Sequence, residues 1–287
     1  MILFDIIVPT YNRYDQLHEF FSGNASLANH PSVHFWFVDD CSPKFDPAAI
    51  PPWNNLTMLR MDKNRGQAYA RNVAIEKGSA PYLISLDDDA WFEDGAASLP
   101  DLIAAFDKYP DAGCLMFNVA TPNSSYYKIP TGTEVPVAVA CGCAYRRQAI
   151  ADIHGFTGFL HSQGEETDTA LRLLRKGWKT RQVESVKVFH NFDYTKRSLQ
   201  WLYYNRHNTT RNDLLVVLMF YPLLYVPVFV VGKFLSHLMF AIRYKVSVGP
   251  TLWHTFTAFF GFLKLTPAAL KRRQPLSFSQ FKHWRSL

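Results

Sequence analysis

Cysteine is scarce in this chain of 287 residues, and its four occurrences do not form a recognisable metal or disulfide framework. Cys141 and Cys143 are separated by one residue, and the sequence offers no second cysteine and histidine cluster to complete a zinc site. The first residues also lack the basic segment and the small-residue cleavage site of a secretory signal. We therefore expect reduced thiols with structural roles and a cytosolic main domain.

Acidic residues are nearly absent from the last third of the chain. Residues 195–287 hold 13 lysines and arginines but one acid, Asp213, so their formal charge is +12. The whole chain carries +6, which leaves −6 for residues 1–194. A basic and strongly apolar tail favours an anionic membrane surface over nucleic acid as its partner.

The tail contains one long stretch without charge, Leu214–Gly232, which has 19 residues. About 20 apolar residues span a bilayer, but Pro222 and Pro227 interrupt this stretch and would bend a helix. Three alternatives remain: a kinked span, helices that lie in the membrane surface, or helices that pack on the main domain. We prefer membrane-surface helices, with basic residues at the lipid headgroups.

The front of the chain alternates between strand-like and helix-like segments. The strands that the apolar runs predict are Ile2–Val8 (ended by Pro9), Val33–Val38, Tyr82–Leu86 and Gly113–Val119. The helices that the spacing predicts follow Asn12 and cover Ala68–Lys77, with Gly78 as C-cap, and Leu99–Phe106. This alternation predicts an α/β domain over 1–194 with a mostly parallel sheet, followed by a helical region over 195–287.

Polar clusters follow three of the predicted strands: PTYNR, DDCS and DDD. Ligands bind beyond the carboxyl ends of parallel strands, so three such clusters indicate one shared site. A nucleotidyltransferase would place a glycine-rich phosphate loop after the first strand, and PTYNRYDQ has no glycine. That alternative is therefore disfavoured.

Three adjacent carboxylates, Asp87, Asp88 and Asp89, need a positive partner because they repel each other. A divalent cation, Mg²⁺ or Mn²⁺, satisfies them, since both ions prefer oxygen ligands. Strand alternation would let Asp87 and Asp89 converge on the ion while Asp88 points away. The alternative is a solvated turn or a helix start.

Two further segments carry candidate groups. Gly66 permits a tight loop, and Arg71 on the following helix could reach a phosphate or a base; the alternative is an ordinary surface arginine. Glu165 and Glu166 begin a helix, where acids suit the dipole. A carboxylate there could also serve as the general base that sugar transfer requires.

Together these motifs resemble glycosyltransferase family 2, the inverting group with the GT-A fold. The motifs are IIVPTYNR (6–13), FVDDCS (37–42), NRGQAYARN (64–72), LDDDA (86–90), GCAYRR (142–147) and the block from 155 to 179. The resemblance covers about residues 4–210, and the order of the motifs makes it specific.

The resemblance implies an inverting, metal-dependent transfer of a sugar from a nucleotide-diphospho-sugar to a hydroxyl of a lipid-linked or oligosaccharide acceptor. Asp87 and Asp89 would hold Mn²⁺ or Mg²⁺, and Glu166 would be the catalytic base. The residues that it places with the nucleotide sugar are Pro9, Thr10, Asn12, Arg13, Asp39, Asp40, Arg71 and Asp88.

His190 falls near a third metal-facing position of some relatives, although a lone histidine after a strand is more often structural. Two departures affect the site: Cys41 replaces a usual glycine, and Glu165 rivals Glu166 as base. Relatives with such tails often act on lipid-linked glycans, which implies the cytoplasmic face of a cell membrane. The alternative function is that of a non-catalytic, membrane-associated partner of other transferases.

Overall fold

The computed structural model describes residues 1–243 and 248–287. The chain forms two compact units, one of Met1–His161 with Arg172–Asp193 and one of Ser162–Leu171 with Tyr194–Leu287. The predicted membrane-associating region, 195–287, includes residues 244–247, which lie outside the described residues. Each unit is considered by itself below.

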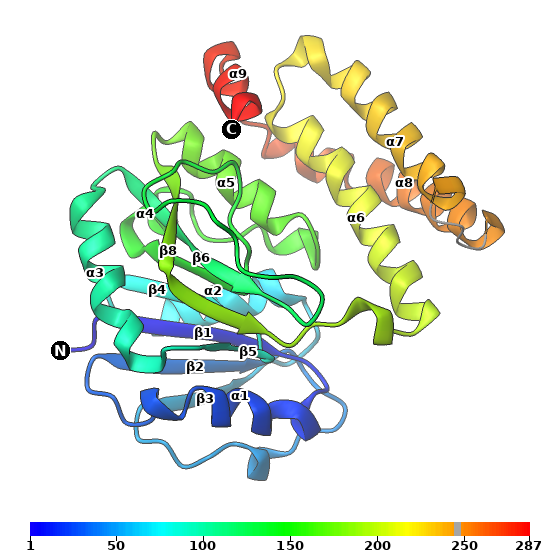
Figure 1. Ribbon diagram of the computed structural model, residues 1–287. Coiled ribbons are helices and arrows are strands. Elements are labelled where there is room, and N and C mark those ends of the chain that lie inside the picture. The colour runs from blue at the N-terminus through cyan, green and yellow to red at the C-terminus, as the bar shows by residue number, and fades with distance from the viewer. Residues whose placement is uncertain (244–247) are drawn as a thin grey trace. The chain divides into compact units, whose positions relative to one another are not determined.

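The first unit is built on a single sheet of eight strands within the described residues (Figure 1). The strands are β1 (Phe4–Thr10), β2 (Val33–Asp39), β3 (Leu56–Arg60), β4 (Tyr82–Leu86), β5 (Ala90–Phe92), β6 (Ala112–Ala120), β7 (Gly142–Arg146) and β8 (Lys179–His190). Their order across the sheet is β3-β2-β1-β4-β7-β6-β8-β5. The mixed α/β sheet that the sequence predicts is therefore confirmed.

The sheet has a parallel half and a mixed half. β3, β2, β1 and β4 pair in parallel, whereas β7 lies antiparallel between β4 and β6. β8 pairs in parallel with β6 and antiparallel with β5 at the edge. Crossovers between the parallel strands place the ends of β1, β2 and β4 at one edge, which is where the polar clusters follow.

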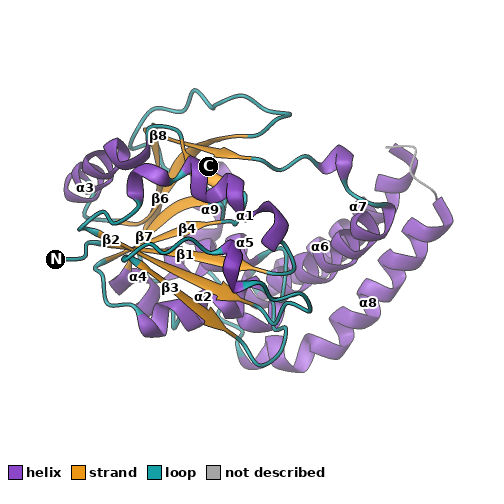
Figure 2. Cartoon of the chain, turned by 90° about the horizontal axis from the view of Figure 1, so that it is seen from below, coloured by secondary structure: helices purple, strands orange, loops and turns teal. Residues whose placement is uncertain are grey.

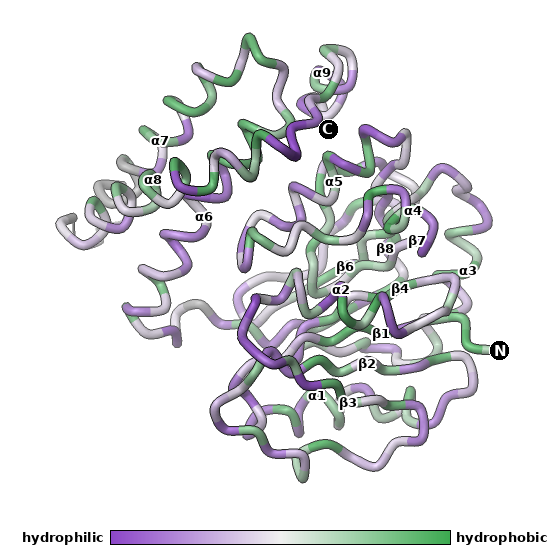
Figure 3. The backbone as a smooth tube through the Cα atoms, turned by 180° about the vertical axis from the view of Figure 1, so that it is seen from behind, coloured by the Kyte–Doolittle hydropathy of each residue, from purple (hydrophilic) through white to green (hydrophobic). Residues whose placement is uncertain are grey.

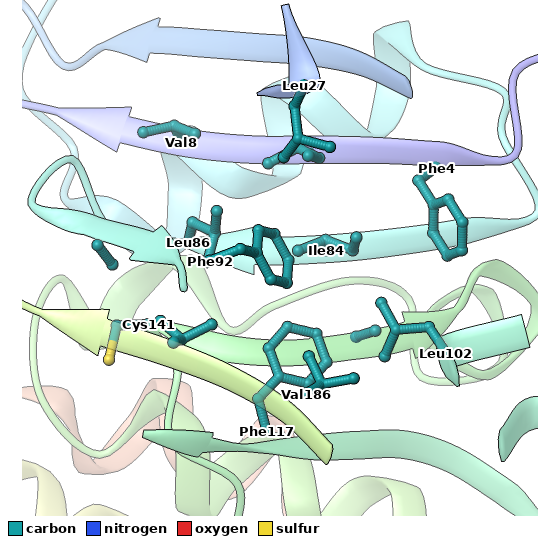
Figure 4. Close-up of a cluster of buried hydrophobic side chains, with 14 of the residues drawn as sticks. Phe4, Val8, Leu27, Ile84, Leu86, Phe92, Leu102, Phe117, Cys141 and Val186 are labelled. Carbon is teal, nitrogen blue, oxygen red and sulfur yellow. The ribbon is translucent and has the colours of Figure 1, made fainter. Parts of the chain in front are cut away.

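Side-chain alternation along the strands divides the core into two layers. On one face Ile6 and Val8 of β1 join Ile84, Leu86 and Phe117 in the larger cluster. Figure 4 shows several of these side chains filling the space against β4 and β6. Nearly every residue of β1 and β6 is buried, because both strands lie inside the sheet with both faces covered.

Helices of the first unit cover the two faces of the sheet (Figure 2). The helices of the described residues are α1 (Leu17–Gly23), α2 (Gln67–Lys77), α3 (Leu99–Lys108), α4 (Arg147–Asp152), α5 (Glu165–Arg175), α6 (Leu199–Phe220), α7 (Val226–Arg243), α8 (Val248–Lys271) and α9 (Phe278–Ser286), of which α6 to α9 belong to the second unit. α1 and α3 contribute to the larger cluster, whereas α2 and α4 contribute to the cluster on the opposite face.

One local expectation is corrected and another is confirmed. Pro9 does not end β1, because pairing with β2 continues to Thr10 after pairing with β4 has stopped at Ile7. Gly78 is the C-cap of α2, as predicted, and has extended backbone with φ −81° and ψ 166°. A glycine is needed there because an added Cβ would lie 2.3 Å from Oδ2 of Asp5.

The second unit is helical. α6, α7 and α8 pack on one another, and the Arg273 guanidinium donates hydrogen bonds to the carbonyl oxygens of Leu218 and Tyr221 at the end of α6. The hydropathy colouring of α7 is mostly hydrophobic (Figure 3). Among the described residues, no helix is long and apolar enough to cross a membrane.

The uncharged stretch 214–232 does not form one helix. α6 ends at Phe220, a short 3-10 turn covers Leu223–Tyr225, and α7 begins at Val226. Pro222 cannot continue α6 because it has no backbone N–H. Pro227, in contrast, is the second residue of α7, in the first turn, where that donor is not needed.

Candidate functional site

The end of β1 binds the aspartate cluster that follows β4. The Thr10 hydroxyl donates to Oδ2 of Asp88 at 2.7 Å, and Arg13 Nε lies 3.2 Å from Oδ1 of the same carboxylate. Arg13 also donates to Oδ2 of Asp89 at 2.7 Å. The predicted meeting of the PTYNR and DDD clusters is therefore present.

The three aspartates lie in the turn between β4 and β5, beyond the strand. Asp88 turns inward to Thr10, and its side chain is 7% exposed, whereas that of Asp87 is 28% exposed. Asp87 and Asp89 both approach one imidazole, since Nε2 of His190 lies 3.9 Å from Oδ2 of Asp87 and 3.0 Å from Oδ1 of Asp89. Asp87 and Asp89 therefore share His190, whereas Asp88 and Asp89 share Arg13, and the three lie in a turn where strand alternation does not apply.

Arg71 is not a surface arginine. Its side chain is 1% exposed, and Nη2 lies 2.9 Å from Oδ1 of Asp87. α2 presents it to the cluster because the neighbouring Ala70 and Ala74 are small and pack the helix closely on the sheet. Arg71 therefore forms an ion pair with Asp87.

The loop after β2 is hydrogen-bonded to the loop after β3 through the carboxylate of Asp40. Oδ1 and Oδ2 of Asp40 accept from the backbone N–H groups of Arg65 and Gly66, each at 2.7 Å. Gly66 has φ +87°, and an added Cβ would lie 2.2 Å from the His161 carbonyl oxygen, so the tight loop requires glycine. Burial raises the pKa of Asp40, although the two backbone donors oppose that rise.

Asp39 is fully buried and holds the turn that contains Cys41. Its carboxylate accepts from the Ser42 backbone N–H and the Ser42 hydroxyl, and the same hydroxyl accepts from the Asn12 N–H at 2.7 Å. Cys41 has φ +63°, a conformation that favours glycine. The turn therefore keeps a left-handed conformation even though cysteine occupies the position.

The charges of the cluster depend on each other. Burial raises the pKa of Asp88 to about 7, against the opposing charge of Arg13. Burial also acts on Asp89, but hydrogen bonds from His190 and Arg13 lower the pKa of that carboxyl below its ordinary value. Burial opposes the charge on His190, yet Asp89 and Asp87 together raise its pKa. Such a set of anionic groups, part of it solvent-accessible, suits a cation.

The sequence interpretation did not place Cys141 at this site. Its Sγ lies 3.2 Å from Nδ1 of His190, and ligand atoms of Asp87, Cys141 and His190 all lie within 4.8 Å of one another. The antiparallel register of β4 with β7 pairs Leu86 with Gly142, so the next residues, Asp87 and Cys141, are neighbours. A single sequence does not show this pairing, because β4 and β7 are far apart along the chain.

Glu165 and Glu166 begin α5 and belong to the second unit. Glu165 is buried, with 1% exposure, whereas Glu166 is half-buried. Nδ2 of Asn212 on α6 donates to the carbonyl oxygens of Ser162 and Gln163, at 2.8 and 2.6 Å. These bonds fix the loop that leads into the two glutamates.

Residues 5–153 match the family model of glycosyl transferase family 2. A Bacillus subtilis protein named for teichuronic acid biosynthesis, glycosyltransferase TuaG, is 29% identical over 97 residues, which cover 32% of this chain and 38% of TuaG. An uncharacterized glycosyltransferase of Haemophilus influenzae is 33% identical over 92 residues, which cover 31% of this chain and 30% of that protein. The matched parts span well under half of both relatives.

Solved structures share the fold. S. aureus TarS in complex with UDP-GlcNAc superposes with a TM-score of 0.61 at 17% identity, covering 92% of this chain and 81% of that chain. Mannosyltransferase PcManGT from Pyrobaculum calidifontis, in complex with GDP-Man and Mn²⁺, gives a TM-score of 0.57 at 17% identity, covering 99% and 78%. At such identities the likeness concerns the fold.

Proposed function

This chain belongs to glycosyl transferase family 2, and from that membership we propose that it transfers a sugar from a nucleotide-diphospho-sugar to an acceptor hydroxyl. The observation that carries the proposal is the convergence of Thr10, Arg13 and the three aspartates at the carboxyl edge of the sheet. Relatives of the same fold bind UDP-GlcNAc or GDP-Man. The donor would bind at this edge, as ligands of open α/β sheets do.

A divalent cation, Mn²⁺ or Mg²⁺, would be held by Asp87, Asp89 and His190. These residues fit an ion because Nε2 of His190 faces both carboxylates, at 3.9 Å from Oδ2 of Asp87 and 3.0 Å from Oδ1 of Asp89. Such an ion neutralises negative charge that develops on the departing diphosphate. The imidazole favours Mn²⁺, since histidine is an uncommon ligand of Mg²⁺.

The protein's own residues would orient the donor. Pro9, Thr10 and Asn12 form the end of β1 and the bend that follows it, beside the loop of Asp39 and Asp40. A carboxylate in that loop would accept a hydrogen bond from the nucleotide base. Arg13, Asp88 and Arg71 would act by holding the metal-facing carboxylates in place, because each of them is paired within the cluster.

Glu166 would be the general base. It is the more accessible carboxylate of the pair, and a base must exchange a proton with the acceptor hydroxyl. The deprotonated oxygen would attack the anomeric carbon opposite the leaving diphosphate, so the configuration inverts. Glu165, buried at 1% exposure, would support the start of α5.

The acceptor would be lipid-linked and reached from a membrane surface, and the helical unit supplies the reason. On and just before α7, exposed apolar residues recur at helical spacing: Leu224, Val228, Val231, Leu235 and Met239. Leu224 is 74% exposed and Val228 is 70% exposed. We call this row the α7 stripe. Water-soluble surfaces seldom expose so regular an apolar row.

α8 carries a second row, the α8 stripe. Its members are Trp253, Phe256, Phe260, Leu263 and Leu270. The opposite face of α8 is buried, and its residues are Thr251, Thr255, Ala258, Phe262 and Ala269. α8, which packs on α6, is thus buried along one side and exposes a row of apolar residues along the other.

Lipid is the occupant that the charge favours. Residues 195–287 carry +12, and Lys264, Lys271 and Arg272 are exposed on or next to α8. Basic residues beside exposed apolar rows suit an anionic headgroup layer above acyl chains. The proposed location is therefore the cytoplasmic face of the cell membrane, in the synthesis of an envelope polysaccharide.

The first experiment is a thermal-shift titration of the purified full chain with nucleotide diphosphates, with and without Mn²⁺. A ligand at 100 times its dissociation constant stabilises the folded state by about 2.7 kcal/mol, which raises the melting temperature by several degrees. We expect one nucleotide to give a shift that requires metal. That result also identifies the donor's nucleotide.

Two isosteric variants separate binding from transfer. Asp87→Asn should lose the metal-dependent shift, whereas Glu166→Gln should keep it and lose sugar transfer in a donor-turnover assay. Near-normal transfer by Glu166→Gln would move the base assignment to Glu165. A folded protein that shifts with no nucleotide would instead be a non-catalytic partner of other transferases.

A further inference from the structure

Cys141 gives the aspartate cluster a sulfur atom that the proposed transfer does not use. The residue directly precedes β7, is 3% exposed, and approaches His190 at the end of β8. Asp87 completes a group whose ligand atoms lie within 4.8 Å of one another. Three separate segments bring a carboxylate, a thiol and an imidazole to one point.

Both ring nitrogens of His190 have a neighbour in the cluster. Nε2 lies 3.0 Å from Oδ1 of Asp89, while Nδ1 lies 3.2 Å from the Cys141 sulfur. The Phe192 ring stacks on the imidazole with centroids 5.4 Å apart, which restricts its rotation. A histidine that donates one N–H to a carboxylate presents its second nitrogen as a ligand, the usual arrangement at protein metal sites.

We propose a second mode of metal binding. In the donor-free protein, Asp87, Cys141 and Nδ1 of His190 bind a borderline-soft divalent ion such as Zn²⁺, and Asp89 orients the histidine. Three protein ligands of these types with a remaining open position are typical of zinc sites. Ligands about 2.0–2.3 Å from an ion lie about 3–4 Å from each other. The observed spacing therefore needs only a small contraction.

The ligand types distinguish this mode from the binding of Mg²⁺ or Mn²⁺. The Nε2 side of His190 faces carboxylate oxygens, whereas the Nδ1 side faces sulfur. Thiolate and imidazole favour Zn²⁺, Co²⁺ and Cd²⁺ over Mg²⁺, because sulfur and nitrogen ligands suit softer ions and Mg²⁺ prefers oxygen. Asp87 is a ligand in both proposed modes, so a bound soft ion should compete with the metal that the donor requires.

The test measures the ion without nucleotide. Titration of the folded, reduced full chain with Cd²⁺ should produce an ultraviolet thiolate-to-cadmium charge-transfer band that saturates at one equivalent. Added Zn²⁺ should abolish the band by displacement, and Mg²⁺ should not. Cys141→Ser should lose the band, while Cys41→Ser, which removes the half-buried thiol of the turn after β2, should keep it.

Further variants test the other groups. Asp87→Asn and His190→Ala should each weaken Cd²⁺ binding at least tenfold, and Asp89→Asn should weaken it about 10–100-fold through loss of the histidine's orientation. Circular dichroism and thermal melting check that each variant folds, and Cys141→Ala replaces Cys141→Ser if the serine variant does not.

The absence of a band in the folded wild-type protein would overturn the proposal, and so would a band that survives in both Cys141 variants. The proposal rests on the proposed function only for the competition with donor metal. A nucleotide shift that requires Mn²⁺, found together with no cadmium band, would leave the transferase proposal standing and remove this one.

Discussion

At the scale of single residues, the pKa of Asp111 is lowered by an arginine that faces it. Asp111, in the turn before β6, accepts from Arg181 of β8 through both oxygens, at 3.0 and 2.6 Å. Lys179 of the same strand lies 3.2 Å from Oδ2. The hydrogen bonds from Arg181 lower the pKa of Asp111 to about 2, from an ordinary value of 3.8. The pair ties β8 to the start of β6.

Asp111→Asn should therefore destabilise the fold in a pH-dependent way. The folded-state pKa is lowered, so the stabilisation is complete above about pH 4 and is lost as the pH falls toward about 2. Because the side chain is 38% exposed, solvent screening reduces the effect to about 1 kcal/mol of unfolding free energy.

Urea unfolding at pH 7, 5 and 3 measures the difference from wild type, which should shrink only at the lowest pH. Asp107→Asn, an exposed aspartate of α3, is the control and should change little. An Asp111 variant as stable as wild type at pH 7 would show that the ion pair contributes nothing to the fold.

At the scale of elements, the junction between α2 and β4 depends on a buried carboxylate. Asp5 of β1 accepts from Trp36 Nε1 at 2.9 Å, from the Ala80 N–H at 2.8 Å and from Arg147 at 2.5 Å. Gly78 passes directly over this carboxylate. The end of α2 is thus positioned by β1, β2 and α4 together.

Gly78→Ala tests this junction. Its φ of −81° suits alanine, and a compatible glycine-to-alanine change alone stabilises by about 0.4–1 kcal/mol. The new Cβ would lie 2.3 Å from the pinned Asp5 carboxylate, and the overpacking should outweigh that gain, with a net loss of about 1–2 kcal/mol. Chemical denaturation measures the loss.

Gly232→Ala, within α7, provides the matched control, because an added Cβ there meets no atom within 4 Å. This variant should be neutral or more stable by up to about 1 kcal/mol. Equal effects at the two positions would mean that Asp5 yields to the Cβ, and that the close approach at Gly78 costs nothing.

Local sequence signals predicted elements that are buried and regular. The apolar runs located β1, β2, β4 and β6 to within two residues, and helical spacing located α2 and α3. β3 was missed because LTMLR is mostly half-buried and lacks clear alternation, and β5 because it has three residues.

The candidate site could be predicted in part for the same reason. Thr10 ends β1, Arg13 follows it, and the aspartates follow β4, which pairs in parallel with β1. The rule that ligands bind beyond the carboxyl ends of parallel strands was therefore enough to predict that they meet. Cys141 could not be placed, since its neighbours depend on the antiparallel insertion of β7 between β4 and β6. No local pattern encodes that pairing.

At the scale of the whole molecule, charge and exposed apolar surface coincide in one part of the chain. The α7 and α8 stripes both fall within residues 195–287, where the formal charge is +12, while residues 1–194 carry −6. An anionic vesicle should therefore attract the helical unit and repel the front of the chain. Insertion of the stripes would then add apolar burial to the electrostatic attraction.

Flotation with vesicles of neutral and anionic composition measures this. Wild type should float with anionic vesicles, and the replacement of Leu224 and Val228 by glutamate should weaken binding at least tenfold, because each buried apolar side chain contributes about 1.5–3 kcal/mol. Ile2→Glu, on an exposed residue of the first unit, should leave binding unchanged.

Raising the salt from about 0.1 M to about 1 M shortens the Debye length from about 10 Å to about 3 Å. That change should weaken binding but not abolish it if the stripes insert. The proposal would be wrong if the wild-type chain did not bind anionic vesicles and instead formed dimers that the double variant disrupts. In that case a second copy of the chain, rather than lipid, would cover the stripes.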